Sequence, residues 1–127
     1  MNGSVKEWLA KAEGDFDIAQ LALGAEVRPN YDAVCFHCQQ CIEKLMKAVL
    51  IHHGLKPPHV HDLVVLSNSV RGEESSWFAE EKELRFLTQG GVVFRYPGES
   101  ATREKAVMAM SVCQRLREGL KQLLTPD

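Results

Sequence analysis

Residues 5–24 alternate apolar and polar positions with the period of an α-helix. Projected at roughly 100° per residue, most of their apolar side chains fall within an arc of about 100°. These side chains are Val5, Trp8, Leu9, Ala12, Phe16, Ala19 and Leu23. The pattern predicts an amphipathic helix. Ile18 and Leu21 fall outside the arc, so we expect them to touch a second neighbour.

Residues 31–53 predict a second helix with a much wider apolar side, an arc of about 160°. The residues on this arc are Tyr31, Val34, Cys35, Cys38, Cys41, Ile42, Leu45, Met46, Ala48 and Val49. An arc of this width is typical of a central helix that touches more than one neighbour. Phe36 and Leu50 lie among the polar residues of the opposite side, which indicates a surface for a partner.

The rest of the chain predicts a short helix over 62–70, a longer helix over 76–89 and a final helix that ends at Leu124. The stretch 92–94 is β-prone, but it has no second strand to pair with, so we interpret it as an extended connector. The fold class is therefore all-α, an up-and-down bundle of four long helices and one short helix, with residues 1–127 forming a single domain.

Residues suited to begin and end helices support this division. Ser4 with Glu7 has the spacing of a capping box before the first helix, and Asp62 can cap the third. Thr102 or Ser100 can start the final helix.

Composition excludes several function classes. The 127 residues carry a formal net charge of −2, so no overall positive field attracts nucleic acid, and any phosphate contact must come from a local patch. The chain has no apolar stretch long enough for a membrane span, and it resembles no export signal, so we expect a cytoplasmic protein. The sequence contains no phosphate-binding glycine loop, hydrolase elbow or zincin motif.

The polar side of the second predicted helix carries the first group of candidate ligand contacts. His37, Gln40, Lys44 and Lys47 lie within about 80° of one another, so an imidazole, an amide and two ammonium groups could converge on one phosphate. Two other interpretations remain open. In the first, this face is solvated, and Glu43 pairs with Lys47 one turn later. In the second, this face binds a protein partner.

A second group of candidates lies where the connector leads into the last helix. Arg95 and Tyr96 come shortly before this helix, whose terminal N–H groups favour anions. Arg95 is therefore the strongest single candidate for a ligand contact, and the alternative is an ion pair with an acid of the first helix such as Asp15. His61 is a further candidate, either as a ligand contact or as a hydrogen-bond partner of a neighbouring element.

Cysteine and histidine clusters raise the question of metal. Cys35, Cys38 and Cys41 spread over about 120° of one helix and point toward its core side, so we predict reduced, buried thiols. The histidines His52, His53, His59 and His61 could surround zinc, but no cysteine pair or carboxylate stands at matching spacing. We predict no metal and no cofactor, and we leave this histidine cluster as an open alternative.

Apolar residues around the fourth predicted helix indicate self-association. They lie on both of its sides, and they are Trp77, Phe78, Leu84, Phe86 and Leu87. We expect a dimer interface here or against Phe36, the alternative being a helix enclosed by its own chain.

Three segments give the sequence a resemblance to the HEPN family, the "higher eukaryotes and prokaryotes nucleotide-binding" domains, over essentially its whole length. Residues 8–15 are similar to the family's opening W-L-x-x-A-x-x-D, and residues 36–47 to F-x-x-Q-Q-A-x-E-K-x-x-K. His61-Asp62-Leu63 is the third segment, and Arg95-Tyr96-Pro97 reinforces it.

The resemblance implies a helical bundle that pairs as a homodimer and is often encoded beside a small nucleotidyltransferase, as in a toxin–antitoxin pair. HEPN ribonucleases use an R-x(4–6)-H motif, which no arginine of this chain provides; the nearest miss is Arg28 to His37. Gly91 stands where the family has a tyrosine upstream of R-Y-P, and Gly98 where an acidic residue is usual, so the shape of this loop is expected to differ.

These observations predict a nucleotide-binding or partner-binding HEPN module that works with a minimal nucleotidyltransferase. One alternative is a divergent, metal-independent endoribonuclease in which Arg95 binds phosphate and His37 or His61 serves as acid or base. Another is a non-catalytic dimerisation adaptor. No catalytic residue is assigned, and the sequence does not identify the nucleotide or RNA.

Overall fold

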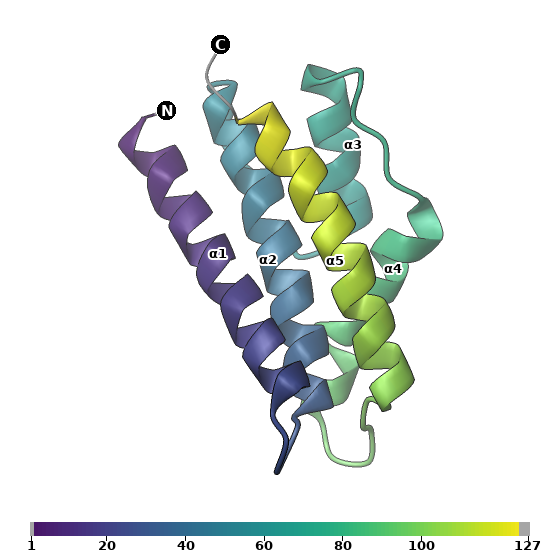
Figure 1. Cartoon of the computed structure of the whole chain (residues 1–127). Helices are drawn as coiled ribbons and strands as arrows, with labels where there is room; N and C mark the ends of the chain where they lie inside the picture. Colours follow the sequence, from purple (N-terminus) through teal and green to yellow (C-terminus); the bar gives the residue numbers. More distant parts are fainter. Residues whose placement is uncertain (1, 125–127) are drawn as a thin grey trace.

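A computed structural model of the protein describes residues 2–124, and the part of the chain that it describes is helical, without strands (Figure 1). The elements are α1 (Gly3–Gly24), α2 (Tyr31–His52), α3 (Leu63–Glu73), α4 (Glu81–Gly90), the 3-10 helix η1 (Val93–Arg95) and α5 (Arg103–Leu123). The predicted all-α fold with five helices is confirmed. None of the described helices is both long and apolar enough to cross a membrane.

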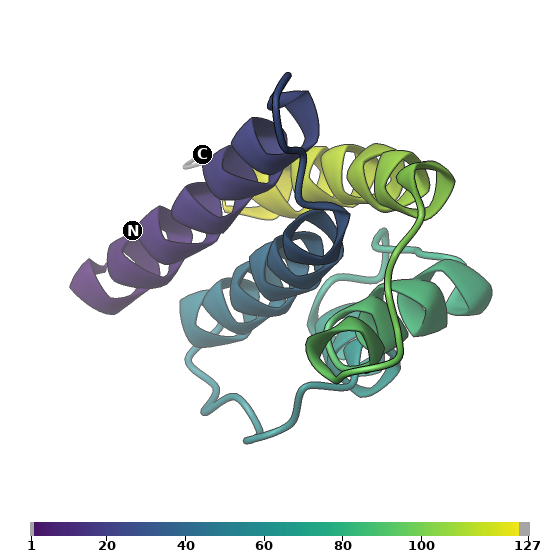
Figure 2. The ribbon, with the colours of Figure 1, turned by 90° about the horizontal axis from the view of Figure 1, so that it is seen from below.

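Helix α2 lies at the centre of the bundle, as its wide apolar arc predicts. It packs against α1, α3, α4 and α5, and the view along the helices shows these neighbours arranged around it (Figure 2). Leu50 was expected on a partner surface, but its side chain is buried in the core. This expectation was wrong because α2 is enclosed on more sides than a single apolar arc accounts for.

Helix α1 covers only one side of α2, and its outer face is open. Ile18 is 46% exposed and Leu21 is 75% exposed, so both lie largely on this open face. The helix also begins earlier than the sequence pattern indicates. Asn2, rather than Ser4, caps it by accepting a hydrogen bond from the backbone N–H of Val5 at 2.8 Å.

Two other helix starts are as predicted, and two local segments differ. Asp62 caps α3 and Thr102 caps α5. Helix α4 begins at Glu81 instead of residue 76, because the Trp77 side chain is buried and its indole N–H donates to Ser67 Oγ at 2.9 Å. The expected extended connector is the 3-10 turn η1.

All four cysteines are free and buried, as predicted for the three on α2. The thiol of Cys38 lies 3.9 Å from the sulfur of Met110 on α5, so this contact between the two helices is rich in sulfur. Burial, helped by the nearby charge of Asp32, raises the pKa of Cys35 to about 11. This thiol therefore stays protonated near neutral pH, which agrees with a packing role.

Candidate functional site

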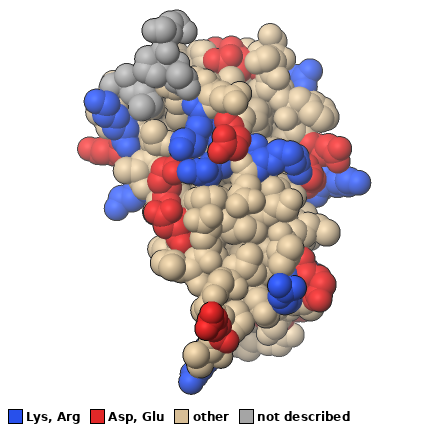
Figure 3. Space-filling model, viewed as in Figure 1, with Lys and Arg blue, Asp and Glu red and all other residues tan. Residues whose placement is uncertain are grey.

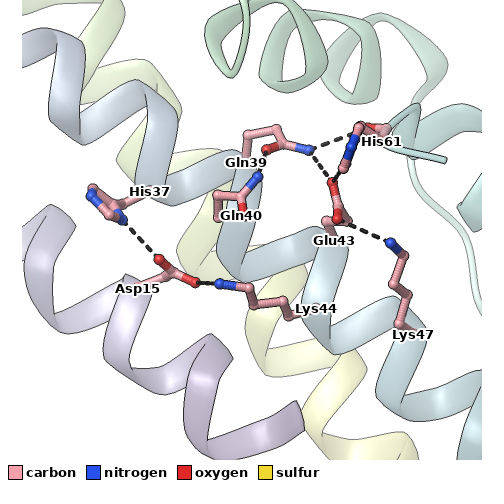
Figure 4. Close-up of polar contacts among 8 residues, drawn as sticks. All are labelled: Asp15, His37, Gln39, Gln40, Glu43, Lys44, Lys47 and His61. Atoms are coloured by element: carbon pink, nitrogen blue, oxygen red, sulfur yellow. Dashed lines mark hydrogen bonds and ion pairs between the residues drawn. The ribbon is translucent and has the colours of Figure 1, made fainter. Parts of the chain in front are cut away.

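The Asp15 carboxylate on α1 is buried, and two α2 side chains compensate its charge (Figure 4). Its Oδ1 contacts Nδ1 of His37 at 2.7 Å, and its Oδ2 accepts a hydrogen bond from Nζ of Lys44 at 2.6 Å. His37 and Lys44 are two helical turns apart, so both can face α1. A buried carboxylate is costly unless it is paired, and these contacts supply the pairing.

A second buried carboxylate, Glu43, lies on α2 itself. It contacts Nδ1 of His61 at 2.8 Å and accepts hydrogen bonds from Gln39 at 2.9 Å and from Lys47 at 3.1 Å. Burial acts to raise the pKa of Glu43, but the hydrogen bonds from Gln39, His61 and Lys47 outweigh burial and hold this pKa below its ordinary value. Glu43 therefore stays charged, and it ties α2 to the segment before α3.

We call these groups together the acid-centred cluster. Its members are Asp15, His37, Gln39, Gln40, Glu43, Lys44, Lys47 and His61 (Figure 4). Gln40 joins it by donating to Oε1 of Gln39 at 2.8 Å. The two carboxylates of the cluster balance its two ammonium groups.

The structure does not bring His37, Gln40, Lys44 and Lys47 around a single anion. His37 and Lys44 meet at Asp15, while Lys47 reaches Glu43, as in the alternative interpretation of this face. Each ammonium group is thus held by a different carboxylate of the chain itself. The cluster orders the α1–α2 face, and an external ligand must use the donors that remain.

His37 also has a ring nitrogen that is free to meet a ligand. Its Nδ1 faces Asp15, and its Nε2 has no hydrogen-bond partner within residues 2–124. No buried side-chain nitrogen or oxygen in that range lacks a partner, so this Nε2 must reach the surface. The carboxylate therefore orients the imidazole and leaves its second nitrogen available to a ligand.

Arg95 lies on the surface beside Phe36, the residue next to His37 in α2. Its guanidinium carbon is 5.0 Å from the ring centroid of Phe36, and that ring meets the His37 ring edge to face at 5.1 Å. Within the described chain Arg95 has no carboxylate at ion-pair distance, and Asp15 binds His37 and Lys44 instead of Arg95. The guanidinium therefore keeps its hydrogen-bond donors free.

The remaining candidates lie apart from this arrangement. Tyr96 is 64% exposed, and the loop that follows it separates Arg95 from the start of α5, where Thr102 supplies the cap. His53 pairs with Glu74 at 3.0 Å. No group of three or more histidine, cysteine or acidic side chains within residues 2–124 is arranged to hold a metal ion.

Sequence reasoning missed Gln39, the role of Asp15 as the shared partner of His37 and Lys44, and the contacts of Glu43 beyond its pair with Lys47. All three lie in the segments that carry the family resemblance, so their positions in those motifs could have identified them from the sequence. It also did not predict that the Phe36 ring lies beneath Arg95. Helical periodicity cannot reveal such roles, because they depend on which side chains of other elements lie opposite.

Comparison with known proteins shows which family and which solved structures this chain is similar to. The sequence model of the HEPN domain matches residues 5–123. The fold is similar to the crystal structure of TT1696 from Thermus thermophilus, with 20% identity over 96% of this chain and 99% of that chain and a TM-score of 0.80. It is also similar to ST0689, an archaeal HEPN homologue, with 22% identity over 95% of this chain and 98% of that chain and a TM-score of 0.73. No curated protein matches.

Proposed function

This chain belongs to the HEPN domain family, and we propose that it is a binding module that holds a nucleotide phosphate between Arg95 and His37. One observation carries the proposal. The Arg95 guanidinium is exposed, rests on Phe36 beside the carboxylate-oriented His37 ring, and has no carboxylate partner in the described chain.

The chemistry of these two groups suits phosphate. A guanidinium presents paired N–H donors that match two phosphate oxygens, and stacking on Phe36 restricts its motion before a ligand arrives. A protonated His37 ring can donate its Nε2–H to the same phosphate while Nδ1–H stays on Asp15. Because the chain as a whole is slightly acidic, binding depends on this local arrangement rather than on a general positive field.

Calorimetric titration with ATP and GTP tests the proposal. We expect binding, with the affinity falling about tenfold in Arg95→Ala, since a charge-assisted phosphate contact is lost. Arg71→Ala is the matched control, because Arg71 also lies over an exposed ring, that of Phe78 at 5.9 Å, away from the acid-centred cluster. Equal affinities in the two variants, or no heat at millimolar nucleotide, would overturn the proposal.

We further propose that the module acts as a homodimer next to a small nucleotidyltransferase, in a toxin–antitoxin-like pair. The family resemblance supports this, and so do the exposed apolar residues near Arg95, with Val92 50% and Val93 37% exposed. Light scattering should give a dimer for the wild type and a monomer for Val92→Glu. Leu21→Glu, on the open face of α1, is the control that should stay dimeric.

A second candidate function, a divergent ribonuclease, rests on a different observation. His37 and His61 each place Nδ1 on a buried carboxylate, an arrangement that can orient an imidazole for proton transfer. Incubation of the purified protein with RNA tests it. Cleavage that is lost in His37→Ala or His61→Ala would favour the enzyme, and intact RNA would favour the binding module.

A further inference from the structure

A pocket of about 450 Å³ opens beside the acid-centred cluster. Its lining consists of three α1 residues, Glu7, Trp8 and Lys11, and one α2 residue, Lys44. Lys44 also belongs to the cluster through its hydrogen bond to Asp15. The pocket and the acid-centred cluster therefore share Lys44.

Trp8 gives this pocket an aromatic wall. Its indole ring is partly exposed and packs against the core. Nζ of Lys47 lies 5.9 Å from the centroid of the ring, and Glu43 holds that ammonium group in place. A partly exposed indole is the type of surface on which a nucleobase stacks.

The polar groups of the pocket are of two kinds. Lys11 has no ion-pair partner in the described chain, and Lys44 spends only one of its three N–H donors on Asp15, so both can donate to phosphate. The Glu7 carboxylate is exposed and likewise has no partner among residues 2–124, so it can accept hydrogen bonds from a base edge. Stacking, cationic and acceptor groups thus meet in one small volume.

We infer that this pocket selects guanine nucleotides, an inference that rests on the proposed nucleotide-binding function. Guanine presents two adjacent donors, N1–H and the N2 amino group, which match the two oxygens of Glu7. Adenine presents a single amino group beside an acceptor nitrogen that the carboxylate repels. The base stacks on Trp8, and Lys11 and Lys44 hold the first phosphate.

The order of residues along α2 gives the direction of the phosphate chain. His37 lies two turns before Lys44, about 10 Å at 1.5 Å per residue, and Lys47 lies one turn beyond (Figure 4). A guanine nucleotide with its base at Trp8 therefore directs its outer phosphates toward His37. GTP fits this order better than a nucleoside monophosphate does.

Calorimetric titration with GTP, ATP and inorganic tripolyphosphate tests the inference. We expect GTP to bind about tenfold more tightly than ATP, and Glu7→Gln to remove this preference. Glu7 is exposed, so its substitution leaves the fold intact. Asp17→Asn, another exposed acid of α1, is the matched control and should keep the preference.

Substitution of the indole provides the second arm. Trp8→Leu should lower the affinity for GTP about tenfold and leave the affinity for tripolyphosphate unchanged, with circular dichroism checking the fold. Trp8→Phe, which retains an aromatic ring, should recover most of the loss.

The outcomes separate the two proposals. Equal binding of GTP and ATP in the wild type would overturn guanine selection, and tripolyphosphate binding as tightly as GTP would overturn the base pocket; both results leave phosphate binding at Arg95 standing. Absence of binding by all three ligands would overturn the proposed function itself.

Discussion

Arg117 and Arg95 both rest on phenylalanine rings, yet their surroundings differ. The Arg117 guanidinium on α5 lies 4.1 Å from the ring centroid of Phe16, and Arg95 lies 5.0 Å from that of Phe36. Arg117 is largely buried and donates twice to Glu13, with its Nε 3.0 Å from Oε1. Arg95 is exposed and has no carboxylate partner in the described chain.

The difference shows how one type of contact can serve structure or binding. Arg117 uses its donors on Glu13 and so joins α5 to α1, whereas Arg95 keeps its donors for a ligand. On the face shown in Figure 3, positive and negative side chains are intermingled, as expected where cations already have partners. A positive residue is therefore a better candidate for binding when its own chain leaves it unpaired.

The largest effect is expected from Arg117→Ala. We expect this change to lower the free energy of unfolding by about 2 kcal/mol, because it removes the two charge-assisted hydrogen bonds that Arg117 donates to Glu13. Urea denaturation measures the change, and the affinity for GTP should not alter. Arg115→Ala is the control, since its pair with Glu83 is more exposed and should contribute less than about 1 kcal/mol. If Arg117→Ala and Arg115→Ala lowered the free energy of unfolding equally, Arg117 would have no special structural role.

A smaller effect on stability is expected at low pH. Burial acts to raise the pKa of Glu13, but its hydrogen bond to Arg117 and the charges of Arg117 and Lys121 outweigh burial and hold this pKa below its ordinary value of 4.5. Charged Glu13 thus stabilises the fold above pH 4.5, and this contribution is lost as the pH falls through the lowered pKa. The difference in stability between the wild type and Glu13→Gln should narrow when thermal unfolding is followed from about pH 6 to about pH 3. If the difference in stability between the wild type and Glu13→Gln did not change with pH, the Glu13–Arg117 pair would make no contribution to stability.

The smallest effect is expected from the ring beneath Arg95. Phe36→Leu should weaken GTP binding about threefold, since an exposed cation–π contact is worth roughly 0.5–1 kcal/mol. Phe16→Leu, which changes the ring beneath Arg117, should lower stability and leave affinity unaltered, because Phe16 is buried in the core. Titration and urea denaturation of both variants decide the matter. If Phe36→Leu instead changed only stability, Arg95 would be structural in the way that Arg117 is.

Local sequence predicted the helices well where one dominant pattern acts. The wide apolar arc of residues 31–53 identified the central helix, and the caps at Asp62 and Thr102 are as expected. It failed at Trp77, which was expected inside a helix, because burial of the indole and its bond to Ser67 are decided by other elements. Propensity within a segment carries no information about such a partner.

The sequence by itself determined that this protein is a bundle of helices with buried thiols, because periodic burial of apolar side chains follows from the order of residues alone. Only the tertiary structure decided which charged side chains of different helices pair with one another. Asp15 of α1 neutralises Lys44 of α2, and Arg95 is left to the solvent. That outcome depends on distances between helices far apart in sequence, since ion pairs and hydrogen bonds require contact within a few ångströms.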